Sequence, residues 1–203
     1  MAAVAAVLLV LLGSSLLIST VAEDRSRERI VQWVGDKAQS VADSVDAFDA
    51  TARLLTERTY RPFREKLPAT FELDVTAQQL KPGAATATTA LNGDFTLVDA
   101  FHRDTGGVAT VFMRKGEDFE RVTTSLKKEN GERAMGTLLA RDHPAYPLML
   151  EGKTYTGRAK LFGKHYMTHY EAVKNAAGQV VGILFIGFDI GDFQTSLDKL
   201  VAQ

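Results

Sequence analysis

Residues 107–128, GVATVFMRKGEDFERVTTSLKK, predict two β-strands joined by a tight turn. Val, Thr and Phe, which suit the pleated surface of a sheet, are frequent in both runs, and the glycine of the GED segment suits the turn between them. Strands joined in this way form an antiparallel hairpin. These residues therefore predict that the sheet of this protein is antiparallel at least in part.

The same pattern continues toward the C-terminus, where β-rich runs alternate with short turns. Two more runs cover residues 155–162 and 166–174, and the last run, VVGILFIGF over 180–188, is apolar throughout. A strand that is apolar on both sides lies inside a sheet that is covered on both faces. We therefore expect about five strands, with the last of them in the middle of the sheet.

A long helix is expected before the sheet. From residue 23 to about residue 67 there is no proline before Pro62, and apolar residues recur at helical spacing. These apolar positions are Val34, Val41, Val45, Phe48, Ala52 and Leu55. Such a helix can form a stalk and also pack on a domain, and Pro62 and Pro68 mark its expected end.

The first 22 residues, MAAVAAVLLVLLGSSLLISTVA, carry no charged side chain and are followed directly by EDRSRER. At a rise of about 1.5 Å per residue, this segment is long enough to cross a bilayer core. An uncleaved transmembrane anchor fits its length, whereas Thr20-Val21-Ala22 fits the cleavage site of a signal peptide. Both alternatives place the rest of the chain outside the cytoplasm.

Composition excludes several other classes of protein. The chain has 203 residues, which suits one main domain, and its net charge of −1 gives no basic field for binding nucleic acid. It has no cysteine, so thiol nucleophiles, disulfides and zinc sites with Cys ligands are absent. The expected divisions are a membrane anchor or signal over 1–22, a stalk helix over 23–67, a sheet domain over 68–190 and an exit helix over 191–203.

Residues 157–170 contain groups that could suggest a nucleotide or metal site. Five residues separate Gly157 from Gly163 where a P-loop has four, and a histidine follows Lys164 in place of Ser or Thr. His165 and His169 are four residues apart, which on a strand corresponds to about 13 Å, too far for one metal ion. We therefore expect no metal, no cofactor and no enzymatic activity.

Alternation along the strands indicates a different kind of site. On the predicted strand FERVTTSL, Arg121 and Thr123 share a face with Phe119 and Ser125. On YMTHY, the side chains of Tyr166, Thr168 and Tyr170 share a face, and those of Met167 and His169 point the other way. If the Arg121 face and the tyrosine face meet in one cavity, that cavity offers hydrogen-bond donors to a small anion such as a carboxylate.

Two long runs carry a resemblance to a known family. They are TGGVATVFMRKGEDFERVTTSLKKENGERAMGT over 105–137 and HPAYPLMLEGKTYTGRAKLFGKHYMTHYEAVKNAAGQVVGILFIGFDI over 143–190. The chain from about residue 30 to residue 200 resembles the single-Cache sensor domains of the Cache 3/Cache 2 fusion type, which occur in bacterial methyl-accepting chemotaxis proteins. The resemblance implies an α+β, PAS-like fold in which a long N-terminal helix packs on a central antiparallel sheet, preceded by a transmembrane helix.

The resemblance also implies a function. It implies a sensor domain in the periplasm, anchored in the inner membrane, that binds a small molecule for chemotaxis-type signal transduction. Related domains often recognise short carboxylates. The ligand-binding residues that we expect are Arg121 and Lys164 for charge, Thr123, Thr168 and Tyr170 as hydroxyl donors, and Phe112, Tyr146 and Tyr166 as walls.

Several alternatives stay open at the level of sequence. The second membrane span and the cytoplasmic module of a chemoreceptor are not in this sequence. The domain could equally be the sensor of a histidine kinase or cyclic-nucleotide enzyme, or a structural or dimerisation module without a ligand. Pairing of two copies through the N-terminal helix is a further expectation.

Overall fold

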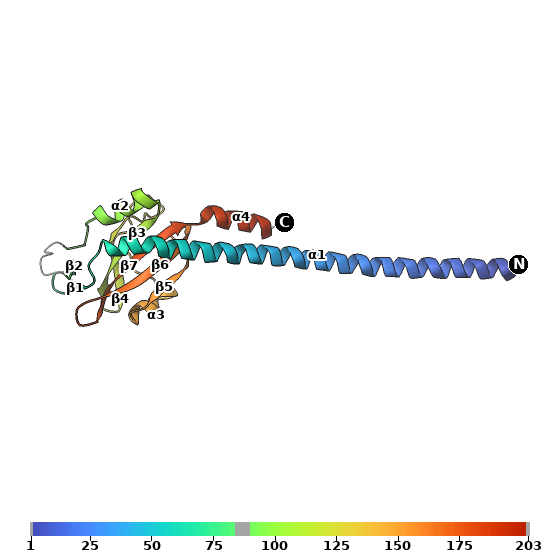
Figure 1. The fold of residues 1–203 in the computed structure, drawn as a ribbon, viewed down its shortest axis with the longest axis horizontal. Coiled ribbons are helices and arrows are strands. Elements are labelled where there is room, and N and C mark those ends of the chain that lie inside the picture. Colours follow the sequence, from blue (N-terminus) through green and yellow to red (C-terminus); the bar gives the residue numbers. More distant parts are fainter. Residues whose placement is uncertain (1, 84–89, 202–203) are drawn as a thin grey trace. The chain divides into compact units, whose positions relative to one another are not determined.

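The computed structural model describes the backbone of residues 2–83 and 90–201, and the side chains of Arg29 and of residues 31–83 and 90–199. The chain divides into two units, Met1–Phe48 and Asp49–Gln203. The elements are α1 (Ala2–Glu65), β1 (Phe71–Asp74), β2 (Gln79–Pro82), α2 (Thr96–Thr105), β3 (Val108–Lys115), β4 (Asp118–Thr124), α3 (Ala145–Leu150), β5 (Thr154–Leu161), β6 (Lys164–Lys174), β7 (Val180–Asp189) and α4 (Gly191–Val201) (Figure 1).

The second unit is built on a five-stranded sheet with the strand order β4-β3-β7-β6-β5. All four strand pairs are antiparallel. Strand β7 is in the middle and is buried from Val180 to Gly187, as its uniformly apolar sequence predicts. The predicted α+β fold, with a long N-terminal helix and a five-stranded antiparallel sheet, is confirmed. A separate antiparallel hairpin of β1 and β2 stands beside the sheet.

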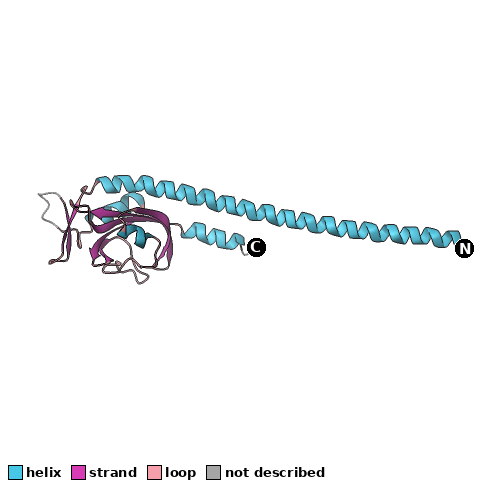
Figure 2. Ribbon diagram, turned by 90° about the horizontal axis from the view of Figure 1, so that it is seen from below, coloured by secondary structure: helices cyan, strands magenta, loops and turns pink. Residues whose placement is uncertain are grey.

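The two faces of the sheet carry separate hydrophobic clusters. On the face that we call the helical face, Tyr60 and Phe63 of α1 and Phe101 of α2 pack on side chains of β3 and β7. The opposite face, which we call the pocket face, carries Phe112, Tyr170 and Phe185 under the helix α3. In Figure 2, the end of α1 runs along one side of the strands. Burial of both faces explains why the central strand β7 is apolar from Val180 to Phe188.

Helix α1 passes through Pro62 and ends at Glu65, one turn beyond the first predicted stop. Proline removes one backbone hydrogen bond, which alone does not end a helix whose next residues are held in place. Phe63 is only 2% exposed, and Arg64 donates hydrogen bonds to the carbonyl oxygens of Leu67 and Pro68. Core packing and these bonds therefore hold the last turn.

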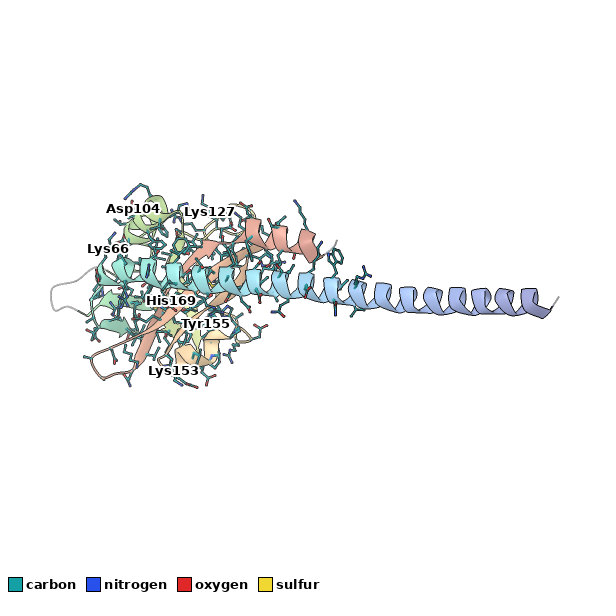
Figure 3. The ribbon with its side chains drawn as sticks, turned by 45° about the vertical axis from the view of Figure 1, so that its right-hand side comes forward. Lys66, Asp104, Lys127, Lys153, Tyr155 and His169 are labelled. Carbon is teal, nitrogen blue, oxygen red and sulfur yellow. The ribbon has the colours of Figure 1, made fainter. Side chains whose placement is uncertain are left out.

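Polar contacts join the last turns of α1 to the strands β5 and β6. The Arg64 guanidinium lies 3.0 Å from the carboxylate of Glu171. The Thr156 hydroxyl donates to Glu57 at 2.9 Å and lies 2.8 Å from Nδ1 of His169, whose ring centroid is 4.3 Å from that of Tyr60. His169 lies under α1 in Figure 3, and Tyr155 is drawn nearer to α3. The helical face of β6 therefore holds α1 by directional bonds as well as by apolar contact.

The first unit, considered by itself, presents apolar side chains to solvent. Val31, Trp33 and Val34 are 71%, 58% and 52% exposed. Pairing of two copies through this helix stays a prediction. Within the residues whose side chains are described, no helix combines the length and the apolar character needed to cross a bilayer. The segment 1–22, predicted as an anchor or a signal, lies outside those residues.

Candidate anion-binding site

Arg121 on β4 is a buried cation on the pocket face. Its side chain packs over the ring of Phe112 at 4.7 Å and lies 5.6 Å from the ring of Phe162. Nη1 donates to the hydroxyl of Thr137 at 2.7 Å, whereas the buried Nε has no hydrogen-bond partner. Arg121 is only 4% exposed, and none of the described Asp and Glu residues forms an ion pair with it. Because an uncompensated buried charge is costly, this geometry suits an external anion.

Two further buried polar atoms lie near this guanidinium. Tyr170 of β6 is fully buried, and its hydroxyl has no hydrogen-bond partner among the described residues. His143, which precedes α3, has a buried Nε2 that is also without a described partner, and its ring centroid is 5.2 Å from that of Tyr170. Buried polar groups normally find a partner within the protein. Three such atoms in one place are therefore a sign of a ligand site.

The backbone determines which proton His143 carries. The amide N–H of Ala145 donates to Nδ1 of His143 at 3.1 Å, so Nδ1 is an acceptor. A neutral imidazole with an accepting Nδ1 has its hydrogen on Nε2. His143 therefore presents an N–H donor at the unpartnered position without taking up a proton. Arg121 and Tyr170 add N–H and O–H donors, so the cluster holds donors and one positive charge.

The electrostatics of the cluster fix its protonation at neutral pH. Burial lowers the pKa of Arg121 to about 10, which still leaves it charged. Burial lowers the pKa of His143, opposed by the negative charge of Asp142 and assisted by Arg121, so His143 is neutral. Burial raises the pKa of Tyr170, against the opposing effect of Arg121, so its hydroxyl keeps its proton.

The predicted alternation is confirmed on β6. Tyr166 and Tyr170 belong to the cluster on the pocket face, whereas His169 contacts α1 on the helical face. The Thr168 hydroxyl donates to the carbonyl oxygen of Gly157 at 2.6 Å, so its proton is already used. Among the hydroxyls predicted on this strand, the one on Tyr170 is left without a partner in the described structure.

The predicted alternation is wrong on β4 beyond Arg121. A β-bulge pairs Phe112 with Arg121 but Val111 with Thr123, which leaves Val122 as the extra residue. Since directly opposite residues share a face, Thr123 lies with Val111 on the helical face. Its hydroxyl donates to the carbonyl oxygen of Asp94 at 2.7 Å. Thr123 is therefore not brought to the anion site.

The remaining predicted residues lie around the site at different distances from its centre. Phe112 is fully buried, and the guanidinium of Arg121 packs over its ring. Tyr146 packs its ring on Phe119, and its hydroxyl donates to the carbonyl oxygen of Glu117 at 2.8 Å. Lys164 is exposed and pairs with Asp189 at 3.3 Å. Phe112 therefore belongs to the site, and Lys164 lies outside the buried cluster.

A groove adjoins the site on its outer side, with a volume of about 700 Å³. Its lining includes His102, Lys127, Lys128, Phe162, Lys164 and Tyr166. Three lysines and Glu129 line the groove, so its lining carries a net positive charge, and Phe162 is common to the groove and to the surroundings of Arg121. Within the described residues, no group of three His, Asp or Glu side chains is arranged to hold a metal ion.

His143 and Phe162 were not predicted as site residues from the sequence. His143 precedes Pro144 in the loop ahead of the short helix α3. Phe162 occupies a hairpin turn, and its contact with Arg121 depends on tertiary structure. Neither position carries a local sequence signal of ligand binding.

The chain thus forms an α+β domain in which a long helix packs on a central antiparallel sheet, with a candidate donor-lined site on the opposite face. Residues 19–203 match the model of the Cache 3/Cache 2 fusion domain, so the chain belongs to that family. Among solved structures, it is similar to the sensory domain of the Campylobacter jejuni chemoreceptor Tlp3 (CcmL). That match has 12% identity and a TM-score of 0.33, and covers 81% of this chain and 67% of the other. No curated protein matches the chain.

Proposed function

We propose that this Cache domain is an extracytoplasmic sensor that binds a small monocarboxylate at Arg121, His143 and Tyr170. The observation that carries the proposal is a buried guanidinium without a described acidic partner, next to two unpartnered donors. A carboxylate has two oxygens with about four acceptor positions, which suits three converging donors. Membership of the Cache family supports the sensory role, because Cache domains are the extracytoplasmic sensor domains of bacterial receptors.

The donor set also selects among small anions. An α-amino acid would bring an ammonium group that needs an acceptor. Asp142 is the acidic neighbour that acts electrostatically on His143, but it is exposed to solvent. The rings of Phe112, Tyr155 and Phe185 around Tyr170 and Arg121 suit a short apolar tail. A monocarboxylate of a few carbons therefore fits the chemistry better than an amino acid.

Titration of the full chain with acetate, propionate and pyruvate tests this proposal. A ligand at about 100 times its dissociation constant stabilises the native state by about 2.7 kcal/mol, which corresponds to a rise in melting temperature of roughly 5–10 °C. Ethylamine and alanine serve as controls and are expected to give no shift. Equal melting temperatures with and without all three acids would show that the cluster does not bind short carboxylates.

The affinity for propionate is expected to be constant near neutral pH and to fall only at high pH. It should stay constant within about twofold between about pH 7 and pH 8.5, because His143 already donates in its neutral form and Tyr170 keeps its proton. Arg121 has its pKa lowered to about 10, so affinity should fall as the pH rises toward that value and the cation loses its charge. Calorimetric titration across this range measures the profile. A steep rise in affinity between about pH 8 and pH 7 would instead show that binding requires a protonated histidine.

A further inference from the structure

The turn between β5 and β6 has an unusual residue at its first position. Leu161 pairs with Lys164, so the turn consists of Phe162 and Gly163, with φ angles of 46° and 81°. A two-residue turn with both φ angles positive favours Asn-Gly, because Asn and Gly tolerate the left-handed region. A bulky aromatic residue is strained there. Contacts elsewhere must therefore hold Phe162 in this conformation.

The ring of Phe162 has contacts on two sides. On the inner side it packs against the cluster of the pocket face and lies 5.6 Å from the guanidinium of Arg121. On the outer side it lines the groove together with Lys127, Lys128 and Lys164. Glu129 also lies against the turn, since a Cβ added to Gly163 would come within 2.7 Å of its Oε1. Phe162 thus stands between the groove and the buried cation.

The position of the Phe162 ring determines how an anion could reach the cluster of Arg121, His143 and Tyr170. Arg121 is only 4% exposed, so entry of a ligand requires some side chain to move. The lysines of the groove attract small anions to its mouth, because a lining of net positive charge raises the local concentration of anions. The strained turn is the element most easily rearranged, since relaxation of the Phe162 backbone offsets part of the lost ring contact.

We propose that Phe162 is the gate of the anion site, and that small anions reach Arg121 from the lysine-lined groove when this turn relaxes. In the closed state the ring covers the guanidinium and keeps water from it, which strengthens the charge–charge interaction with a bound anion. In the open state the groove and the cluster form one continuous cavity. The identity of the anion rests on the proposed function, whereas access to Arg121 does not.

Chemical modification of Arg121 tests the gate without any ligand. Phenylglyoxal reacts with accessible arginine side chains, and mass spectrometry reports the rate at each position. In the variant Phe162→Asn, which places the favoured Asn-Gly pair in the turn, Arg121 is expected to react at least tenfold faster than in the wild type. Arg141, whose side chain is 60% exposed, serves as the internal control and should react equally in both proteins.

A second variant separates the ring from the turn. Phe162→Leu keeps an apolar side chain of similar reach, so Arg121 should stay protected to within about threefold of the wild type. A single cooperative thermal transition well above the assay temperature shows that Phe162→Asn is folded, since the favoured Asn-Gly turn offsets part of the lost ring contact. If phenylglyoxal modifies Arg121 at the same rate in Phe162→Asn and in the wild type, with the rate at Arg141 unchanged, Phe162 does not control access to Arg121.

Binding kinetics with propionate extend the test to the ligand. Both the association and the dissociation rate constants of Phe162→Asn are expected to rise at least tenfold over those of the wild type. If the wild type binds no propionate, the proposed function fails, and the phenylglyoxal rates still decide whether Phe162 controls access. If the wild type binds propionate and both rate constants of Phe162→Asn equal those of the wild type, Phe162 does not control access. The proposal of a carboxylate site would then be unaffected.

Discussion

Replacement of Arg121 by Met is expected to raise the stability of the ligand-free protein and to abolish its stabilisation by propionate. The wild type buries this cation against Phe112, at a cost in desolvation that no acidic side chain among the described residues offsets. Methionine is unbranched and apolar and can follow a similar path through the cluster. The free energy of unfolding without ligand should increase by about 2 kcal/mol, measured by thermal denaturation.

Arg133→Met is the matched control for this prediction. Arg133 forms a pair of hydrogen bonds to Asp99, at 2.7 and 2.8 Å, and also donates to the carbonyl oxygen of Thr124. Its removal leaves these acceptors without their partner, so the melting temperature should fall while the shift caused by propionate remains. A lower melting temperature for Arg121→Met, or a propionate shift that persists in it, would contradict the assigned role of Arg121.

The substitution Gly182→Ala is expected to lower the free energy of unfolding by about 3 kcal/mol. Gly182 is buried on the central strand β7, opposite Met113 of β3. A Cβ at this position would lie 2.3 Å from the carbonyl oxygen of Phe112 and 3.1 Å from the side chain of Leu80. Because the closest atom belongs to the backbone, the two strands must separate to make room. Denaturant unfolding measures the loss.

Gly35→Ala provides the comparison for the same chemical change. Gly35 lies within α1, and nothing stands within 4 Å of an added Cβ there. Alanine in a helix is favoured over glycine, so this variant should be as stable as the wild type or slightly more stable. Equal stability of Gly182→Ala and wild type would show that the β3–β7 contact is more adaptable than its geometry indicates.

The sheet was predictable from the sequence because short turns join β3 to β4, β5 to β6 and β6 to β7, and the residues of these strands favour β-structure. On β6 the alternation is uninterrupted from Tyr166 to Tyr170, and the bulge on that strand begins only at Val173. On β4 the bulge falls directly after Arg121. A strict alternation of side chains therefore predicted the wrong face for Thr123. A bulge depends on how two strands meet, and one strand's sequence does not reveal it.

The anion site was predictable only in part for the same reason. Arg121 and Tyr170 could be chosen because strand periodicity places each of them on a donor-bearing face of its own strand, whereas the sequence left open whether the two faces meet. His143 comes from a loop before α3, and its donor role depends on the amide of Ala145. Phe162 gains its contact with Arg121 only when the β5–β6 hairpin is placed in the fold. Both residues therefore require tertiary structure to be recognised.

Strand β6 has consequences beyond the pocket, since neighbouring residues on it serve the two faces of the sheet. Tyr170 presents its hydroxyl to the pocket face, and the adjacent residues His169 and Glu171 contact Tyr60 and Arg64 of α1. Adjacent residues share a peptide plane, so their displacements are mechanically coupled. A single peptide step on β6 thus joins a residue of the candidate ligand pocket to residues that contact the helix α1.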